Sequence, residues 1–120
     1  MNYDRFKFRA WNKKESVMHY NAEYAYDHME GKPVLMHDSF GGLLEDENYI
    51  VEQCTGLKDK NGKLIYEGDV LLFNGSRNPV YFDDGSFVIL HSGSVFIPIK
   101  QKYTDVFEII GNIHEMESEK

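Results

Sequence analysis

The sequence predicts a mainly β protein with little helix: a small antiparallel, SH3-like barrel in the C-terminal half, preceded by an N-terminal β-hairpin extension. Three observations carry this prediction. Residues 5–10 alternate strictly between basic and apolar side chains, turn signals recur at short intervals from residue 49 onward, and no long helical period separates them. With 120 residues, 42% of them hydrophobic, the chain has the size and composition of one domain. We therefore predict a single domain over residues 1–120, with an N-terminal β part over about 1–48 and a barrel-like part over about 49–113.

The N-terminal hairpin is predicted from the run Arg-Phe-Lys-Phe-Arg-Ala at residues 5–10. In a strand, alternate side chains point to opposite faces. Phe6, Phe8 and Ala10 are therefore expected on one face and Arg5, Lys7 and Arg9 on the other. Residues 12–15 form a polar turn, and residues 16–20 return as the second strand.

Residues 21–48 show no clear period, and Pro33 and Gly41-Gly42 interrupt any long element. We expect loops with short elements here, including a helical turn near residues 43–47.

The second half is punctuated by turns at Asn61-Gly62 and Asp84-Gly85, and one reversal between them is marked by Asn74-Gly75 and Asn78-Pro79 together. Ser92-Gly93 is expected to separate the next two strands. The strand-like runs between these turns are residues 49–51, 64–66, 70–73, 80–82, 87–90, 95–99 and 106–113. The spacing is typical of a small antiparallel barrel. The polar tail from residue 115 is expected to fray.

Composition excludes several classes of protein. The net charge is −7, divided between residues 1–50 (9 acids, 6 bases) and residues 51–120 (11 acids, 7 bases), which argues against a generic nucleic-acid binder. Cys54 is the single cysteine, so an internal disulfide is impossible and a small core residue is the favoured interpretation. No apolar run approaches the roughly 20 residues that span a bilayer, and the N-terminus lacks a secretory pattern. We predict a cytoplasmic location in the bacterial host and no membrane partner.

Three stretches resemble the YopX family of phage and prophage proteins. They are Lys-Phe-Arg-Ala-Trp at residues 7–11, the central signature at residues 55–63 and 65–70, and Phe-Glu-Ile-Ile-Gly-Asn-Ile-His-Glu at residues 107–115. The resemblance brackets nearly the whole chain but is silent between residues 20 and 47. It implies a gene carried by a mobile element and a β-rich fold with a barrel-like C-terminal part, and it implies no assigned activity.

The central signature has a structural and a functional interpretation. Gly62 and Gly68 permit positive φ, and Asp59, Asn61 and Asp69 can bind nearby backbone amides, so turn chemistry is favoured. A divalent cation between Glu67 and Asp69 would need more converging oxygens than the sequence offers. The five histidines lack zinc-site spacing, so we predict no metal and no cofactor. A Cys–His nucleophile would need a histidine close to Cys54 in space, and nothing beside Cys54 supports one, so no catalytic residue is assigned and the chain is predicted not to be an enzyme.

The best candidate binding face is the basic N-terminal strand: Arg5, Lys7 and Arg9, with Trp11 beyond them. A solvated strand face that discourages edge pairing is the simpler interpretation. The leading functional hypothesis is a binding module that contacts a host or phage protein. The alternative is a nucleic-acid-binding accessory protein using this strand, because bases stack on aromatic rings beside cations. In a third hypothesis, net acidity lets the protein compete with DNA for a host partner. Homo-oligomerisation stays open.

Overall fold

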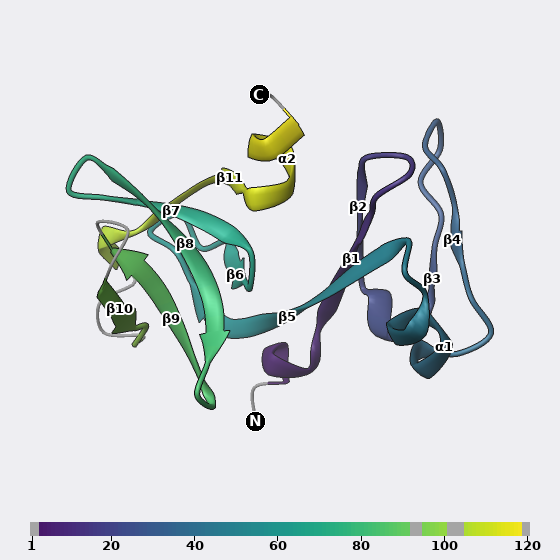
Figure 1. The fold of residues 1–120 in the computed structure, drawn as a ribbon, viewed down its shortest axis with the longest axis horizontal. Coiled ribbons are helices and arrows are strands. Elements are labelled where there is room, and N and C mark those ends of the chain that lie inside the picture. Colours follow the sequence, from purple (N-terminus) through teal and green to yellow (C-terminus); the bar gives the residue numbers. More distant parts are fainter. Residues whose placement is uncertain (1–2, 92–94, 101–104, 119–120) are drawn as a thin grey trace.

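The computed structural model describes residues 3–91, 95–100 and 105–118, and Figure 1 shows them as a β-rich molecule with two groups of strands. The first half of the chain contains the 3-10 helices η1 (Asp4–Phe6) and η2 (Ala22–Tyr24), the helix α1 (Phe40–Glu45), and the strands β1 (Phe8–Asn12), β2 (Val17–Tyr20), β3 (Tyr26–Asp27) and β4 (Leu35–Met36). The second half contains β5 (Tyr49–Lys58), β6 (Leu64–Tyr66), β7 (Asp69–Phe73), β8 (Ser76–Asp83), β9 (Ser86–His91), β10 (Val95–Pro98), β11 (Glu108–Asn112) and the helix α2 (Ile113–Ser118). No helix among the described residues is long and apolar enough to cross a membrane.

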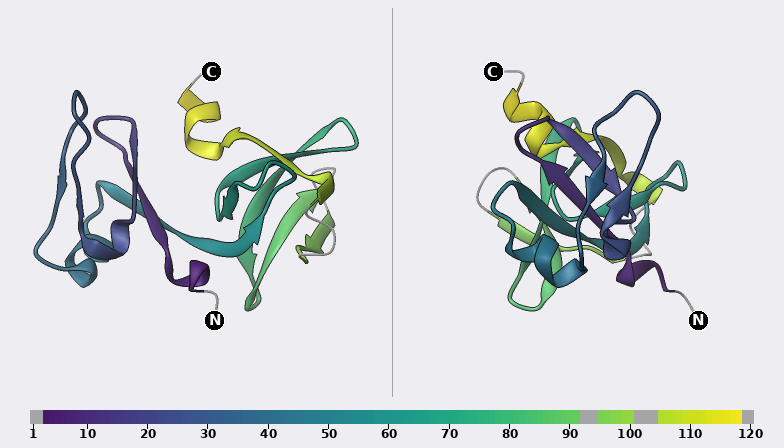
Figure 2. Two further views of the ribbon diagram at one scale, coloured as in Figure 1. Left: turned by 180° about the vertical axis from the view of Figure 1, so that it is seen from behind. Right: turned by 90° about the vertical axis from the view of Figure 1, so that its right-hand side faces the viewer.

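One antiparallel sheet has the strand order β2-β1-β5-β6, and a second has the order β10-β9-β8-β7-β11. A separate two-stranded ribbon pairs β3 with β4. The long strand β5 runs from one group of strands to the other, as Figure 1 and the left panel of Figure 2 show. Strand β5 therefore links the two halves of the molecule.

The hairpins of the five-stranded sheet follow from their turn residues. Asn74 and Gly75 have φ of 50° and 76°, and Asp84 and Gly85 have φ of 49° and 80°. Two successive residues with positive φ define the turns whose twist matches that of the flanking strands, so the Asn-Gly and Asp-Gly pairs set the β7–β8 and β8–β9 registers.

The molecule has two separate apolar cores. The C-terminal core packs residues from β6 to β9 against Phe107: Ile65, Leu71, Val80, Ile89 and Phe107. The N-terminal core is built from smaller pieces of β1, η2, β4 and α1: Ala10, Ala22, Leu35 and Leu43, with Phe8, Phe40, Tyr49 and Val51 around them. The polar contacts described below lie where β1, β5 and β7 meet, and they belong to neither core.

The structure confirms a mainly β fold with little helix, an N-terminal hairpin and short elements over residues 21–48. The antiparallel sheets curl into a half-barrel, and a closed SH3-like barrel stays a prediction.

Four local predictions are wrong, and one lies outside the described residues. The first strand begins at Phe8, because residues 4–6 form η1 and leave Phe6 exposed. Asn78-Pro79 lies inside β8, opposite Leu71 and Val70. Strand β11 ends at Asn112, and the tail continues as α2 because the Asn112 side chain accepts hydrogen bonds from the amides of residues 114 and 115. Strand β5 extends to Lys58. Ser92-Gly93 is not among the described residues.

Candidate functional site: a buried ion network beside a groove

Arg9 is the centre of a buried ion network. It lies on β1 directly opposite Glu52 of β5, and only 2% of it is exposed. Its Nε donates to Glu52 Oε1 at 2.8 Å, its Nη1 to Asp69 Oδ1 at 2.8 Å and its Nη2 to the Glu67 carbonyl at 3.1 Å. The guanidinium also lies 4.9 Å from the centre of the Tyr66 ring. One side chain of β1 thus binds β5 and the β6–β7 turn.

The second half of the network reaches the C-terminal helix. His114 Nε2 lies 2.9 Å from Glu52 Oε2, and Trp11 stacks on the His114 ring at 5.3 Å between centroids and an interplanar angle of 13°. Asp69 Oδ2 accepts a hydrogen bond from the Tyr66 amide at 2.8 Å. Both oxygens of Glu52 and both oxygens of Asp69 therefore have partners.

Burial and pairing act in opposite directions on the charges of this network. Burial alone would lower the pKa of Arg9, but the carboxylates of Asp69 and Glu52 raise it above its ordinary value. Burial raises the pKa of Asp69, although Arg9 opposes the change. Burial also raises the pKa of Glu67, which lies beside these groups. A charge in this place is tolerated only while its partners are present, so we interpret the network as a structural joint between the two halves.

The three stretches that resemble the YopX family meet at this joint. Arg9 and Trp11 come from the first stretch, Asp69 from the second and His114 from the third. Glu52, which lies in none of them, connects Arg9 to His114. Three segments that are far apart in the chain therefore build one cluster.

The central signature acts through turn chemistry, as expected. Asp59 accepts backbone hydrogen bonds from Asn61 and Lys63 through Oδ1 and from Ile109 through Oδ2. Burial would raise the pKa of Asp59, but these bonds lower it below its ordinary value. Gly62 has a φ of 79° and open space where a Cβ would stand.

Gly68, the other glycine of the signature, has a φ of 88°, and a Cβ there would overlap the Glu52 carboxylate. The two glycines therefore serve different purposes: Gly62 allows a turn, and Gly68 also allows the close approach of the network.

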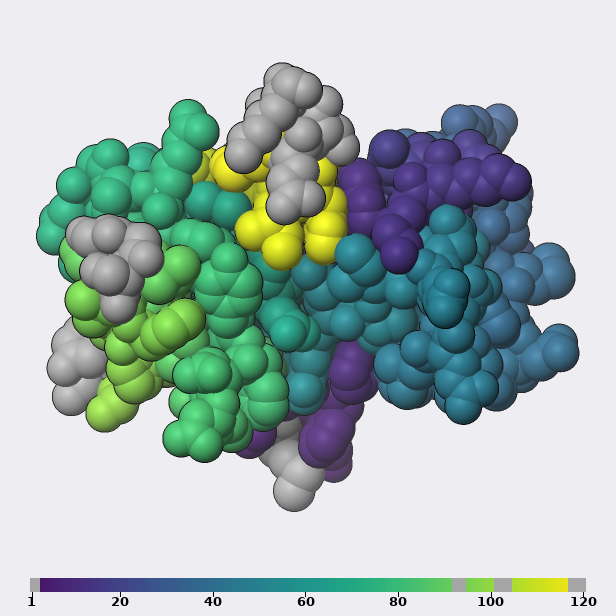
Figure 3. Space-filling model, viewed as in Figure 1, coloured from purple at the N-terminus to yellow at the C-terminus, as the bar shows by residue number. Residues whose placement is uncertain are grey.

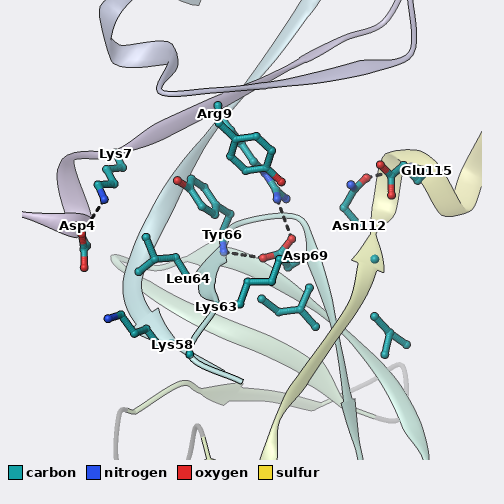
Figure 4. Close-up of a pocket in the computed structure, with 15 residues that line it drawn as sticks. Asp4, Lys7, Arg9, Lys58, Lys63, Leu64, Tyr66, Asp69, Asn112 and Glu115 are labelled. Carbon is teal, nitrogen blue, oxygen red and sulfur yellow. Dashed lines mark hydrogen bonds and ion pairs between the residues drawn. The ribbon is translucent and has the colours of Figure 1, made fainter. Parts of the chain in front are cut away.

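A groove of about 710 Å³ opens beside the network (Figure 4). It lies between β6 and β11, each of which is the last strand of its sheet. The segments that flank the two strands are joined at both ends: before the strands the Lys60 amide donates to the Phe107 carbonyl, and after them the Ile113 amide donates to the Gly68 carbonyl. The lining residues are Asp4, Lys7, Arg9, Tyr20, Lys58, Gly62, Lys63, Leu64, Tyr66, Asp69, Ile109, Ile110, Gly111, Asn112 and Glu115.

The four predicted binding residues do not share one exposed face. Lys7 and Arg9 line the groove, but Lys7 pairs with Asp4 at 3.1 Å and Arg9 is occupied by its carboxylates. Trp11 is 6% exposed and stacks on His114, so the expected stacking surface is covered. Arg5 is exposed in η1, outside the strand. The alternation of β1 does place Arg9 on the face that points away from the N-terminal core. That face is not exposed, because β7 and α2 of the second half of the chain cover it.

Cys54 and the possible metal ligands were the other candidate groups of the sequence. Cys54 is fully buried, and burial raises the pKa of its thiol, which disfavours the thiolate that a nucleophile needs. Among the described residues, no three histidine, cysteine, aspartate or glutamate side chains are grouped so that they could hold a metal ion.

The fold and the site together define a class: a small, mainly β protein whose two halves are joined by a buried ion network beside a strand-edge groove. Residues 7–118 match the family model described as YopX protein, and the chain belongs to the YopX family. No curated protein matches it significantly.

Two solved structures resemble the chain over nearly its whole length. The crystal structure of protein EF1440 from Enterococcus faecalis shares 28% sequence identity, with a TM-score of 0.61 and coverage of 92% of this chain and 94% of that chain. The crystal structure of protein yopX from Bacillus subtilis shares 15% identity, with a TM-score of 0.58 and coverage of 96% and 95%, which shows the shared fold alone. Membership in the family assigns no biochemical activity.

Proposed function

We propose that this chain is a phage- or prophage-borne binding module of the bacterial cytosol that holds an extended segment of a host or phage protein in the groove between β6 and β11. One observation carries the proposal: the groove is bordered by two strands that each end a sheet. A terminal strand has one row of backbone amides and carbonyls without a strand partner, and an extended peptide pairs with such a row. Asp69 binds the Tyr66 amide of β6 and Asp59 binds the Ile109 amide of β11, so a peptide would pair with other backbone groups of these edges.

The side chains along the groove suit a peptide. Leu64, Ile109 and Ile110 supply apolar contacts, and Ile110 is 37% exposed where the β7–β11 register shifts. Lys58 and Lys63 are exposed and form no ion pair within the described chain, so they can bind carboxylates of a ligand. The groove volume of about 710 Å³ falls in the usual range of about 300–1,000 Å³ for small-molecule sites, so it can accommodate several side chains of a peptide.

The nucleic-acid alternative has weaker support. Stacking platforms for bases need exposed aromatic rings beside available cations. Trp11 is buried, Arg9 is neutralised by carboxylates, and the whole chain carries a net charge of −7. A protein ligand is therefore favoured.

A site-specific crosslinking experiment tests the proposal. A photoreactive amino acid replaces Ile110 in one variant and Ile97 in a matched control; both isoleucines are 37% exposed, and β11 and β10 are the opposite edges of one sheet. After irradiation in the bacterial host, we expect a discrete protein adduct at residue 110 that is absent at residue 97 and is lost when Lys58 and Lys63 are changed to glutamate. Equal labelling at both positions contradicts the proposal, and adducts to nucleic acid at residue 110 favour the alternative.

A further inference from the structure

The negative charge of the protein is concentrated in one segment. Residues 21–48 carry 7 acidic residues and 1 basic residue, a net charge of −6 in a chain whose total is −7. The net charges of residues 1–50 and 51–120 do not reveal this concentration, because residues 1–20 carry 5 bases and 2 acids that offset the acidic segment. The segment forms η2, β3, β4 and α1, and we call it the acidic end. Figure 2 shows the β3–β4 ribbon at the extreme of the molecule, away from the five-stranded sheet.

The β3–β4 ribbon has one packed face and one open face. Leu35 is fully buried in the N-terminal core, and its register partner Asp27 binds His19 at 2.9 Å. The other register pair, Tyr26 and Met36, is 52% and 73% exposed. Residues directly opposite on paired strands lie on the same face, so these two form an uncovered apolar pair.

Three further large apolar side chains of the acidic end are exposed: Tyr24 is 75% exposed, Met29 53% and Val34 41%. Large apolar side chains left exposed together mark interaction sites more often than ordinary surface. Methionines adapt to partners of varied shape. In Figure 3 the blue acidic end lies at one margin of the molecule, away from the green strands of the five-stranded sheet.

Charged groups of the acidic end are mostly acidic, and several of them are available. Glu30, Asp38, Glu45 and Glu47 are exposed and make no ion pair with described residues. Nearby bases are Lys32 and the turn residues Lys13 and Lys14, whose backbone amides bind Asn48. The three other acids are engaged within the fold: Glu23 accepts a hydrogen bond from the Phe8 amide, Asp27 binds His19, and Asp46 binds His37 at 3.1 Å.

We propose that the open face of the acidic end is a second interaction surface, which binds a partner protein through a surface that combines lysine or arginine with apolar side chains. The charge argues against other occupants. A two-fold contact between two copies would set this face against itself and bring −6 against −6. Nucleic acid and anionic lipid surfaces carry the same sign of charge as the acidic end. The proposal does not depend on the groove between β6 and β11.

Defined peptides test this surface. The probes are a fluorescent peptide of lysines and leucines, a second in which serine replaces leucine, and a third in which glutamate replaces lysine. The wild type should bind the lysine–leucine peptide at least tenfold more tightly than the lysine–serine peptide and should not measurably bind the glutamate peptide. Affinity should fall at least tenfold in Tyr26→Ser/Met36→Ser and should fall again when Glu30, Asp38, Glu45 and Glu47 are changed to glutamine.

Matched controls distinguish binding at this surface from nonspecific hydrophobic binding. Phe82 is as exposed as Tyr26, at 52%, so Phe82→Ser should leave peptide affinity within twofold. Ile110→Asp, in the groove, should also leave it within twofold, and unchanged thermal unfolding midpoints show that the acidic-end variants fold. Equal affinity for the lysine–leucine and lysine–serine peptides, or equal losses in Phe82→Ser and Tyr26→Ser/Met36→Ser, overturns the proposal. Sedimentation that shows a dimer lost on Tyr26→Ser/Met36→Ser also overturns it.

Discussion

The joint around Arg9 differs from the acidic end in whether its charged groups are buried and paired or exposed. The joint collects charged groups from three distant parts of the chain, buries them and pairs each one. The acidic end collects charged and apolar groups from one continuous segment and leaves them exposed. A buried, paired charge fixes the structure around it, whereas an exposed, unpaired one is available to a partner.

The resemblance to the family follows the same division. All three family-like stretches contribute to the joint, and the acidic end lies in the part of the chain where no family motif was found. We infer that the joint holds the two halves of this fold together, whereas the exposed groups of the acidic end leave the fold free to vary there. Substitutions in the first region should change stability, and substitutions in the second should change binding.

The largest effect is expected for Arg9→Ala. This change leaves Glu52 and Asp69 buried without their main counter-charge, and breaking a buried ion pair typically costs about 3–5 kcal/mol. Urea denaturation measures the loss in free energy of unfolding. Arg5→Ala is the matched control, because Arg5 is exposed and should change stability by less than about 0.5 kcal/mol.

A second variant separates charge from packing at Arg9. Arg9→Met together with Glu52→Gln and Asp69→Asn removes all three charges, and it should recover part of the stability that Arg9→Ala loses. If Arg9→Ala costs no more than Tyr26→Ser in the acidic end, the contrast between the two regions fails.

The next largest effect distinguishes the two glycines of the central signature. Gly62→Ala should cost about 1–2 kcal/mol, because its positive φ strains any side chain while the space around it is open. Gly68→Ala carries the same strain and also forces a methyl group into the Glu52 carboxylate, which adds about 1–3 kcal/mol of overpacking. Thermal or urea unfolding of both variants gives the comparison. Equal losses in the free energy of unfolding would show that the close approach of the Glu52 carboxylate to Gly68 adds nothing to the cost of a side chain there.

A smaller, pH-dependent effect is expected at Asp59, which ties the central signature to β11. Its folded pKa lies below the ordinary value because its backbone hydrogen bonds outweigh burial. A lowered carboxyl pKa stabilises the fold above the unfolded pKa of about 4, and this contribution is lost as pH falls through the folded pKa.

Asp59→Asn should therefore cost about 1–2 kcal/mol near neutral pH, by weakening charge-assisted hydrogen bonds, and less below about pH 4. Urea unfolding at several pH values measures the difference from the wild type. Asp84→Asn, in an exposed hairpin turn, controls for the substitution itself. A loss that is constant from pH 7 to pH 3 would contradict the pKa argument.

The sequence predicts the regular parts of the fold well. Asn74-Gly75 and Asp84-Gly85 are local signals with local consequences, so the hairpins they close are placed correctly. The N-terminal hairpin follows in the same way from alternation. The reversal predicted at Asn78-Pro79 is wrong, because these residues lie inside β8. Proline is tolerated at strand positions that need no amide donor, so it does not always mark a turn.

The joint could not be predicted, because its members are far apart in the chain. Alternation shows that Arg9 points away from Ala10 and the N-terminal core, and it cannot show that β7 and α2 cover that opposite side. A signal was nevertheless present: Arg9, Asp69 and His114 each lie within a stretch that resembles the family. The acidic end was missed for a different reason, since comparing the charge of the two halves averaged basic residues 1–20 with acidic residues 21–48.

The smallest effect is expected for DNA binding, which the N-terminal basic residues would have to support. With Arg9 buried and paired, Arg5 and Lys7 are the bases left from the predicted row, and Lys7 already pairs with Asp4. Two phosphate contacts would give a salt dependence with a slope of only about two, and the acidic end repels the same polymer. We therefore expect weak binding at physiological salt and little change in Arg5→Ala/Lys7→Ala.

Fluorescence anisotropy with short single- and double-stranded oligonucleotides at two salt concentrations provides the measurement. Arg9 is left intact in this variant, because its loss would unfold the joint and imitate a loss of binding. Changing Glu30, Asp38, Glu45 and Glu47 to glutamine is the informative counterpart: it removes exposed negative charge without touching the basic residues. If electrostatic repulsion is what keeps DNA away, this variant should bind more tightly than the wild type, and the gain should shrink at high salt because the repulsion is screened. A contrary result is submicromolar DNA binding by the wild type that is weakened by salt and lost in Arg5→Ala/Lys7→Ala. It would make nucleic acid the favoured partner and the acidic end an ordinary solvated surface.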